Sequence, residues 1–169
     1  MRPDRIIVGE VRGPEAATLL TAMNTGHDGS FGSLHANTGA ETITRLINPP
    51  MDVPPIMLTG LDLIIIQARL HVKGKTARKI VEVSEVAGME GDKPRLNPIW
   101  KYNAESDQIE ETGIPSKMKE TICKAAGCNP ATFEQHVQQR MGILNDLVER
   151  DISDIGTVTQ VIQGFYSSR

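Results

Sequence analysis

Arg5-Ile6-Ile7-Val8-Gly9-Glu10 is a short run that holds three β-branched residues and ends in a carboxylate. Its apolar residues follow one another without alternation, which predicts a central strand that is buried on both faces. A strand of this kind delivers the residue that follows it to the carboxyl edge of a sheet. Glu10 is therefore expected at that edge.

The next residues predict a helix, because Pro14 suits a first helical turn and is followed by apolar residues at helical spacing, namely Ala16, Leu19, Leu20 and Met23. A second short strand is expected at 30–35. It is followed by a helix that begins with a capping box of Thr38 and Glu41 and ends at Pro49. The order strand, helix, strand, helix predicts a parallel sheet with helices packed on it.

The pattern then changes to one that is typical of antiparallel strands. Apolar and polar residues alternate over 64–72, residues 73–75 offer a turn, and the alternation resumes at 81–84. This predicts a hairpin, with edge strands added at 94–102 and 107–112.

The last third of the chain is predicted to be helical. Asn129 and Pro130 supply a cap and a first turn, and Ser153 is expected to cap a final helix. We interpret two apolar stripes as core faces: Phe133, Val137, Met141, Leu144 and Val148, then Ile155, Val158, Ile162 and Phe165. The fold class is therefore α/β, with a partial parallel sheet, helices and a hairpin extension over 1–113 and a small helical module over 114–169.

The composition argues against several classes of function. A formal net charge of −3 gives no reason to expect nucleic-acid binding, which usually needs a basic face. No apolar run approaches the roughly 20 residues of a transmembrane segment, and the first residues do not form a signal peptide. Cys123 and Cys128 lack the further ligands of a zinc site, so we interpret them as reduced thiols of a cytoplasmic protein.

Two stretches carry the candidate functional residues. One is the strand that ends in Glu10, because many nucleotide hydrolases place a carboxylate beside Mg²⁺ and the attacking water in this way. A structural ion pair between Glu10 and Arg12 is the alternative. The other stretch, 25–38, combines glycines that permit tight turns with His27 and His35, which can donate to phosphate oxygens. A structural role as a cap or loop anchor stays open for both histidines.

Gly74-Lys75-Thr76 resembles the end of a phosphate-binding loop, G-x-x-x-x-G-K-[ST]. The first glycine of that motif would fall at position 69, which is an arginine. The tripeptide is also expected to turn a hairpin instead of joining a strand to a helix. We therefore expect no phosphate-binding loop within these 169 residues.

Together the two stretches resemble the secretion and pilus traffic ATPases, which comprise the type II and type IV secretion ATPases and their archaeal pilus and archaellum relatives. The Walker B strand of that family is similar to RPDRIIVGEVRGPEA at 2–16, and its histidine box is similar to TGHDGSFGSLHANT at 25–38. The order of the two motifs and their separation by one helix also match. The resemblance covers nearly the whole chain.

The resemblance implies a role for each matching residue. Glu10 corresponds to the Walker B glutamate, which acts on the attacking water and, directly or through water, on Mg²⁺. His35 corresponds to the histidine near the γ-phosphate, and both residues are expected to be catalytic. Arg12 and His27 match positions that are expected to help bind the nucleotide.

The resemblance also implies a RecA-like ATPase that forms cytoplasmic hexamers at the inner face of the cytoplasmic membrane. Its cofactors would be ATP and Mg²⁺, and its partner an inner-membrane platform protein of a pilus, archaellum or secretion machine. The family's N-terminal domain and phosphate-binding loop would precede residue 1, so we expect a C-terminal part that is inactive alone and holds no tightly bound nucleotide. The alternative is a non-enzymatic assembly or regulatory module that binds longer ATPase relatives.

Overall fold

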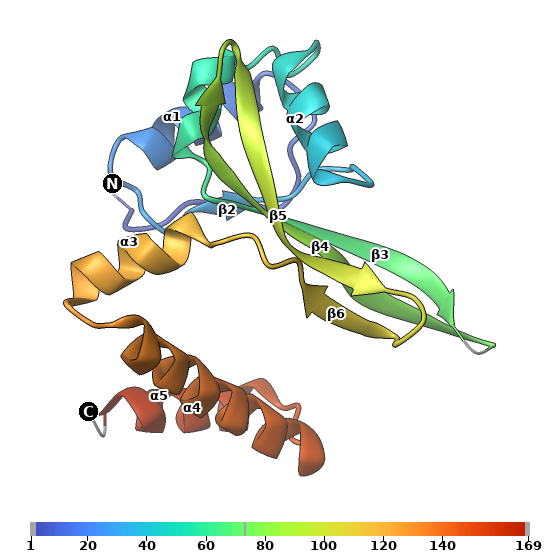
Figure 1. Ribbon diagram of the computed structural model, residues 1–169, viewed down its shortest axis with the longest axis vertical. Coiled ribbons are helices and arrows are strands. Elements are labelled where there is room, and N and C mark those ends of the chain that lie inside the picture. The colour runs from blue at the N-terminus through green and yellow to red at the C-terminus, as the bar shows by residue number, and fades with distance from the viewer. Residues whose placement is uncertain (1–2, 73, 168–169) are drawn as a thin grey trace. The chain divides into compact units, whose positions relative to one another are not determined.

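Figure 1 shows a computed structural model of the chain, in which residues 3–72 and 74–167 are described. The chain divides into two compact units, residues 1–118 and 119–169. Both sheets belong to the first unit, and the second is helical. In the described ranges, no helix combines the length and apolar character that a membrane span requires.

The first unit opens with two strands and two helices in alternation: β1 (Ile7–Val8), α1 (Glu15–Asn24), β2 (Phe31–Gly32) and α2 (Gly39–Ile47). The two strands pair in parallel, as the sequence predicts. However, the prediction that β1 is buried on both faces is wrong for this unit, because Ile7 is 64% exposed. A sheet of two short strands leaves part of its surface uncovered.

An antiparallel sheet follows, in the order β3 (Leu63–Val72), β4 (Lys75–Glu90), β5 (Lys93–Asn103) and β6 (Gln108–Glu111). The predicted hairpin is confirmed, and strands form at both of the other predicted positions. β6 is an edge strand as predicted, whereas β5 is not, because it pairs with β4 on one side and β6 on the other. Lys73, which belongs to the predicted turn, lies outside the described residues. The neighbouring Gly74 has a φ of 76°, a conformation that glycine adopts without strain.

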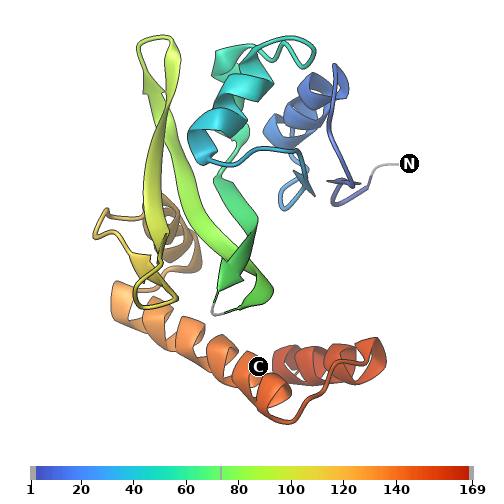
Figure 2. The ribbon, with the colours of Figure 1, turned by 90° about the vertical axis from the view of Figure 1, so that its right-hand side faces the viewer.

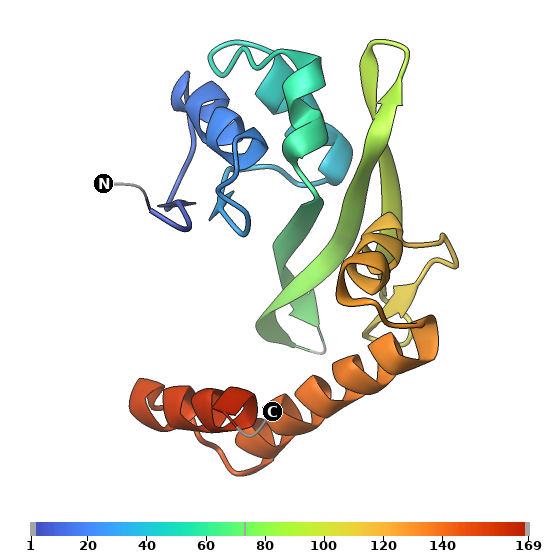
Figure 3. The same cartoon turned by 90° about the vertical axis from the view of Figure 1, so that its left-hand side faces the viewer.

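The core of the first unit lies between the helices and one face of the long sheet. Helix α2 and the 3₁₀-helix η1 (Pro55–Gly60) contact the strands of this sheet, and α1 packs against η1 (Figures 2 and 3). Ile64 and Ile66 are buried there, whereas Ile65 between them is 56% exposed. Strand β3 is therefore buried on one face, the pattern expected of an antiparallel sheet.

The start of α2 follows the predicted capping box in part. Thr38 Oγ1 accepts a hydrogen bond of 3.0 Å from Glu41 N, as expected of an N-cap. The Glu41 side chain returns to Asn37 N instead of Thr38 N, at 2.8 Å. The helix ends at Ile47, before the two prolines.

Three helices complete the chain: α3 (Lys117–Ala126), α4 (Pro130–Glu149) and α5 (Ile155–Ser167). Asn129 caps α4 as predicted, because its Oδ1 accepts a hydrogen bond from Thr132 N at 2.8 Å. Near the start of α5, Asp154 accepts a hydrogen bond from Thr157 N at 2.9 Å. The prediction that Ser153 caps this helix is therefore wrong by one residue.

The apolar stripe of α4 is more exposed than its spacing predicts. Met141, Leu144 and Val148 are 46%, 56% and 78% exposed, whereas Leu147 is buried at 5%. The interpretation of this stripe as a core face is wrong for those three residues. A unit of this size offers little opposing apolar surface to cover them.

The core of the first unit should depend strongly on Leu58, which is completely buried in η1. We expect Leu58→Ala to lower the free energy of unfolding by about 2–5 kcal/mol, because it leaves a cavity. Ile56→Ala in the same 3₁₀-helix is the matched control, since Ile56 is 65% exposed. Urea denaturation of both variants measures the difference, and equal losses would contradict the assigned core.

Candidate functional site

The parallel pairing of β1 and β2 brings two of the candidate residues together. Ile7 pairs with Phe31 and Val8 with Gly32, so both strands end at the same edge of the small sheet. Glu10 follows one strand and His35 follows the other. The Nε2 atom of His35 lies 2.9 Å from Glu10 Oε1.

Backbone contacts continue the pairing beyond the strands and fix this edge. Ser33 N donates to Val8 O at 3.3 Å, Val11 N donates to Ser33 O at 2.7 Å, and Ser33 Oγ donates to Gly9 O at 2.6 Å. A Cβ at Gly32 would lie 2.8 Å from Leu19 Cδ2, so glycine permits the close approach of β2 to α1.

Arg12 makes a two-pronged ion pair with Glu10. Its Nε lies 2.6 Å from Glu10 Oε1, and its Nη2 donates to Oε2 at 2.7 Å. This hydrogen bonding is the largest influence on the Glu10 carboxyl and lowers its pKa below the usual value, while desolvation opposes the shift and the charge of His35 adds to it. The ion pair that the sequence left as an alternative is thus present in the structure.

One oxygen of Glu10 has an unusual environment. Oε1 is shielded from solvent and has no hydrogen bond of good geometry within the described part of the chain, although Arg12 Nε and His35 Nε2 approach it closely. The Arg12 guanidinium and the His35 ring therefore occupy the space around Oε1. A carboxylate oxygen is a suitable acceptor for a water on Mg²⁺, which keeps most of its waters when it binds to carboxylates, and such a water would reach Oε1 after one of these side chains moves away.

The described residues do not form a site that would bind a metal ion through several side chains. The described residues contain no group of three or more His, Cys, Asp or Glu side chains that could hold a metal ion. The outer contact of Glu10 to Mg²⁺ through water stays a prediction of the sequence.

His27 does not join this group. Its Nδ1 lies 2.8 Å from the backbone oxygen of Pro3, which precedes β1, and His27 itself precedes β2. Both residues therefore belong to the end of the sheet opposite Glu10 and His35. The structure unites Glu10, Arg12 and His35, and it separates His27 from them.

Glu15 is a contributor that the sequence analysis missed. Its Oε1 accepts hydrogen bonds from Arg12 N at 2.7 Å and Gly13 N at 2.9 Å, which fixes the backbone that carries the guanidinium. These backbone hydrogen bonds lower the pKa of Glu15. The available signal was an acid in the first turn of α1, which commonly reaches back to free N–H groups before a helix.

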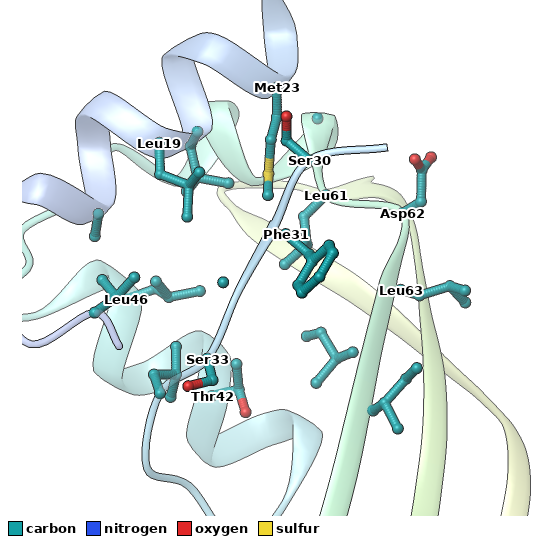
Figure 4. A pocket seen from close by; sticks show the side chains of 18 of the residues that line it. Leu19, Met23, Ser30, Phe31, Ser33, Thr42, Leu46, Leu61, Asp62 and Leu63 are labelled. Carbon is teal, nitrogen blue, oxygen red and sulfur yellow. The ribbon is translucent and has the colours of Figure 1, made fainter. Parts of the chain in front are cut away.

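A pocket of about 810 Å³ lies beside this site within the first unit. Residues of α1, β2, α2 and β3 line it, and Figure 4 shows the Phe31 ring in the space between β2 and β3. Phe31 is 58% exposed. The small sheet therefore presents apolar side chains that nothing in the described residues covers fully.

The pKa of the Glu10 carboxyl should change when its ion-pair partner Arg12 is removed. We expect Arg12→Ala to raise the pKa of Glu10, measured by carbon-13 NMR of the carboxyl during a pH titration. A lowered pKa in the folded state stabilises the fold above the unfolded pKa, and this contribution disappears as the pH falls through the folded value. In Arg12→Ala the contribution should disappear at higher pH.

Arg45→Ala is the control for this titration, because Arg45 pairs with Glu41 at 2.7 Å and not with Glu10. It should leave the Glu10 titration unchanged. An unchanged Glu10 midpoint in Arg12→Ala would contradict the ion pair.

Comparison with known proteins extends these observations. Residues 1–161 match the family described as type II/IV secretion system protein. An uncharacterized protein of Methanocaldococcus jannaschii is 32% identical over 170 residues, which cover 98% of this chain and 31% of that protein. A putative conjugal transfer protein of Mycobacterium tuberculosis is 39% identical over 115 residues, 66% of this chain and 32% of that protein.

The type IV pilus assembly ATPase PilB of Pseudomonas aeruginosa is 48% identical over 67 residues, which cover 38% of this chain and 11% of that protein. The chain thus spans about a third or less of the length of these three relatives. Because the family match extends over nearly all of its residues, the chain belongs to the type II/IV secretion system family of ATPases.

Proposed function

We propose that this chain is the C-terminal part of a hexameric ATPase that powers assembly or export at the inner face of the cytoplasmic membrane. Residues 1–113 would form the C-terminal half of a RecA-like core, and 114–169 a helical module. The observation that carries the proposal is the pairing of Glu10 with His35 at the carboxyl edge of two parallel strands. Open α/β sheets bind their ligands at this edge.

The exposed surface of the small sheet supports a longer chain. Parallel sheets are normally covered on both faces, and two strands of two residues each are too little for a stable sheet. Ile7 and Phe31, which pair across β1 and β2, are both more than half exposed. Further strands of the same protein would cover these side chains and the neighbouring pocket.

Each residue of the group has a role in this proposal. Bound Mg²⁺ and ATP would supply the electrophilic phosphorus and its charge neutralisation. Glu10 would hold the attacking water, and His35 would donate a hydrogen bond to a phosphate oxygen. While Arg12 pairs with both oxygens of Glu10, the lowered pKa makes this carboxylate a weak base.

The ion pair between Glu10 and Arg12 leaves two ways in which the site would work. In the first, Glu10 acts mainly by orienting water, which suits phosphoryl transfer because positioning and electrostatics provide most of its catalysis. Alternatively, Arg12 would release Glu10 when nucleotide enters and turn to the phosphates. In both cases the ion pair seen here describes the site before nucleotide binds. His27 would bind the nucleotide from a different place, because it lies at the opposite end of the sheet.

The phosphate-binding loop would come from outside these residues. Gly74, Lys75 and Thr76 lie where the β3–β4 hairpin turns into β4, and not between a strand and a helix. We therefore expect the 169-residue chain to show no saturable micromolar binding of MgATP in calorimetry. A micromolar dissociation constant would contradict this expectation and would favour a self-sufficient nucleotide site.

Glu10→Gln tests the catalytic proposal in the longer protein. We expect turnover to fall by about 10²- to 10⁴-fold, the usual contribution of a group that activates or positions water, while nucleotide binding is retained. Glu90→Gln is the matched control, because Glu90 is an exposed carboxylate at the end of β4.

Steady-state hydrolysis and nucleotide titration of the two variants give the answer. Retention of more than about a tenth of turnover in Glu10→Gln, well above the expected range, would leave Glu10 as a structural partner of Arg12. A longer protein without hydrolysis would favour the alternative, a non-enzymatic module that binds ATPase relatives.

A further inference from the structure

His35 owes its position to its loop and not to packing of its own side chain. The imidazole is 83% exposed, yet its Nε2 lies 2.9 Å from Glu10 Oε1. The loop is anchored at its near end by the contacts of Ser33 with the β1 segment. Its far end enters α2 through Thr38 and Gly39. The placement of His35 therefore depends on how firmly the start of α2 is held.

A carboxylate from the long sheet holds that start. Glu82 Oε1, on β4, accepts a hydrogen bond of 3.2 Å from Gly39 N, the first N–H of α2. Ser84 Oγ donates to the same oxygen at 2.6 Å, and Ser84 is completely buried. Glu82 is itself half-buried. A negative charge at a helix N-terminus is favourable, and this one also pairs a helical N–H that no turn of the helix can satisfy.

The absence of a side chain at Gly39 permits this contact. A Cβ at position 39 would lie 2.5 Å from Glu82 Oε1 and 3.4 Å from Ser84 Oγ, which donates to that oxygen. Glycine costs about 1 kcal/mol relative to alanine within a helix. The close approach of backbone to carboxylate gives a physical reason for glycine at this position.

We infer that Glu82 is a positioning residue for the candidate site: by fixing the N-terminus of α2 to β4, it keeps His35 against Glu10. The significance of this role for hydrolysis rests on the proposed function, but the role itself is a statement about geometry. Loss of Glu82 should free the loop between Ser33 and Gly39 and separate the imidazole from the carboxylate.

The experiment is NMR of the 169-residue chain, which reads the geometry without reference to hydrolysis. In the unsubstituted chain we expect a nuclear Overhauser effect between the His35 ring and the Glu10 side chain. Glu82→Ala should abolish it and should speed hydrogen exchange of the Gly39 amide about tenfold or more, as expected when a hydrogen bond to a charged acceptor is lost. Glu82→Gln, which keeps an acceptor oxygen, should restore the Overhauser effect.

Two further variants separate positioning from helix stability. Gly39→Ala improves the helix propensity of α2 but pushes the Glu82 carboxylate away, so we expect the Overhauser effect to be lost here too. Glu90→Ala on the same strand should retain it, because Glu90 is exposed at the end of β4.

The inference is overturned if the Overhauser effect persists in Glu82→Ala while the Gly39 amide exchanges faster, since α2 would then fray without moving His35. If Glu82→Ala does not fold, Gly39→Ala decides the matter in the same way. A failure of the proposed hydrolysis would leave all of these outcomes unchanged, so the two failures are distinguishable.

Discussion

The parallel pairing of β1 with β2 is the constraint on which the site depends. Parallel strands end at the same edge, so residues that follow them meet even when they are far apart in the sequence. Glu10 and His35 are brought within 2.9 Å in this way. A one-residue slip would turn side chains to the other face, and the backbone contacts of Ser33 oppose such a slip.

The carboxylate at this edge is already paired with charged side chains of the same chain. Arg12 occupies both oxygens of Glu10 and lowers its pKa, while Glu15 fixes the backbone of Arg12. The same group supports either a resting state that nucleotide opens or a carboxylate that only orients water. In both accounts the supporting contacts come from several elements, since α1, α2 and β4 each contribute a carboxylate.

The sequence predicted most elements of the fold, because strong local signals determine them: Pro14, Thr38 and Asn129 each lie where a helix begins. It did not predict the exposure of Ile7 or of Met141, which depends on how much surface the rest of the protein covers. It placed Glu10 at the carboxyl edge of a parallel sheet, and the parallel pairing of β1 with β2 brings His35 to the same edge. It could not separate His27 from them, because the contact of His27 with Pro3 depends on the path of a loop. It could not identify Glu82 either, because this residue lies 43 positions from Gly39, from whose N–H it accepts a hydrogen bond.

We propose that nucleotide is hydrolysed at the carboxyl edge of β1 and β2, and a structure of the longer protein with Mg²⁺ and a non-hydrolysable ATP analogue would test this proposal. We expect the γ-phosphate to lie at that edge. His35 would then be within hydrogen-bond reach of a phosphate oxygen, and Glu10 would contact the attacking water or a water on Mg²⁺. A nucleotide bound elsewhere, with Glu10 still paired to Arg12 and remote from the phosphates, would contradict it.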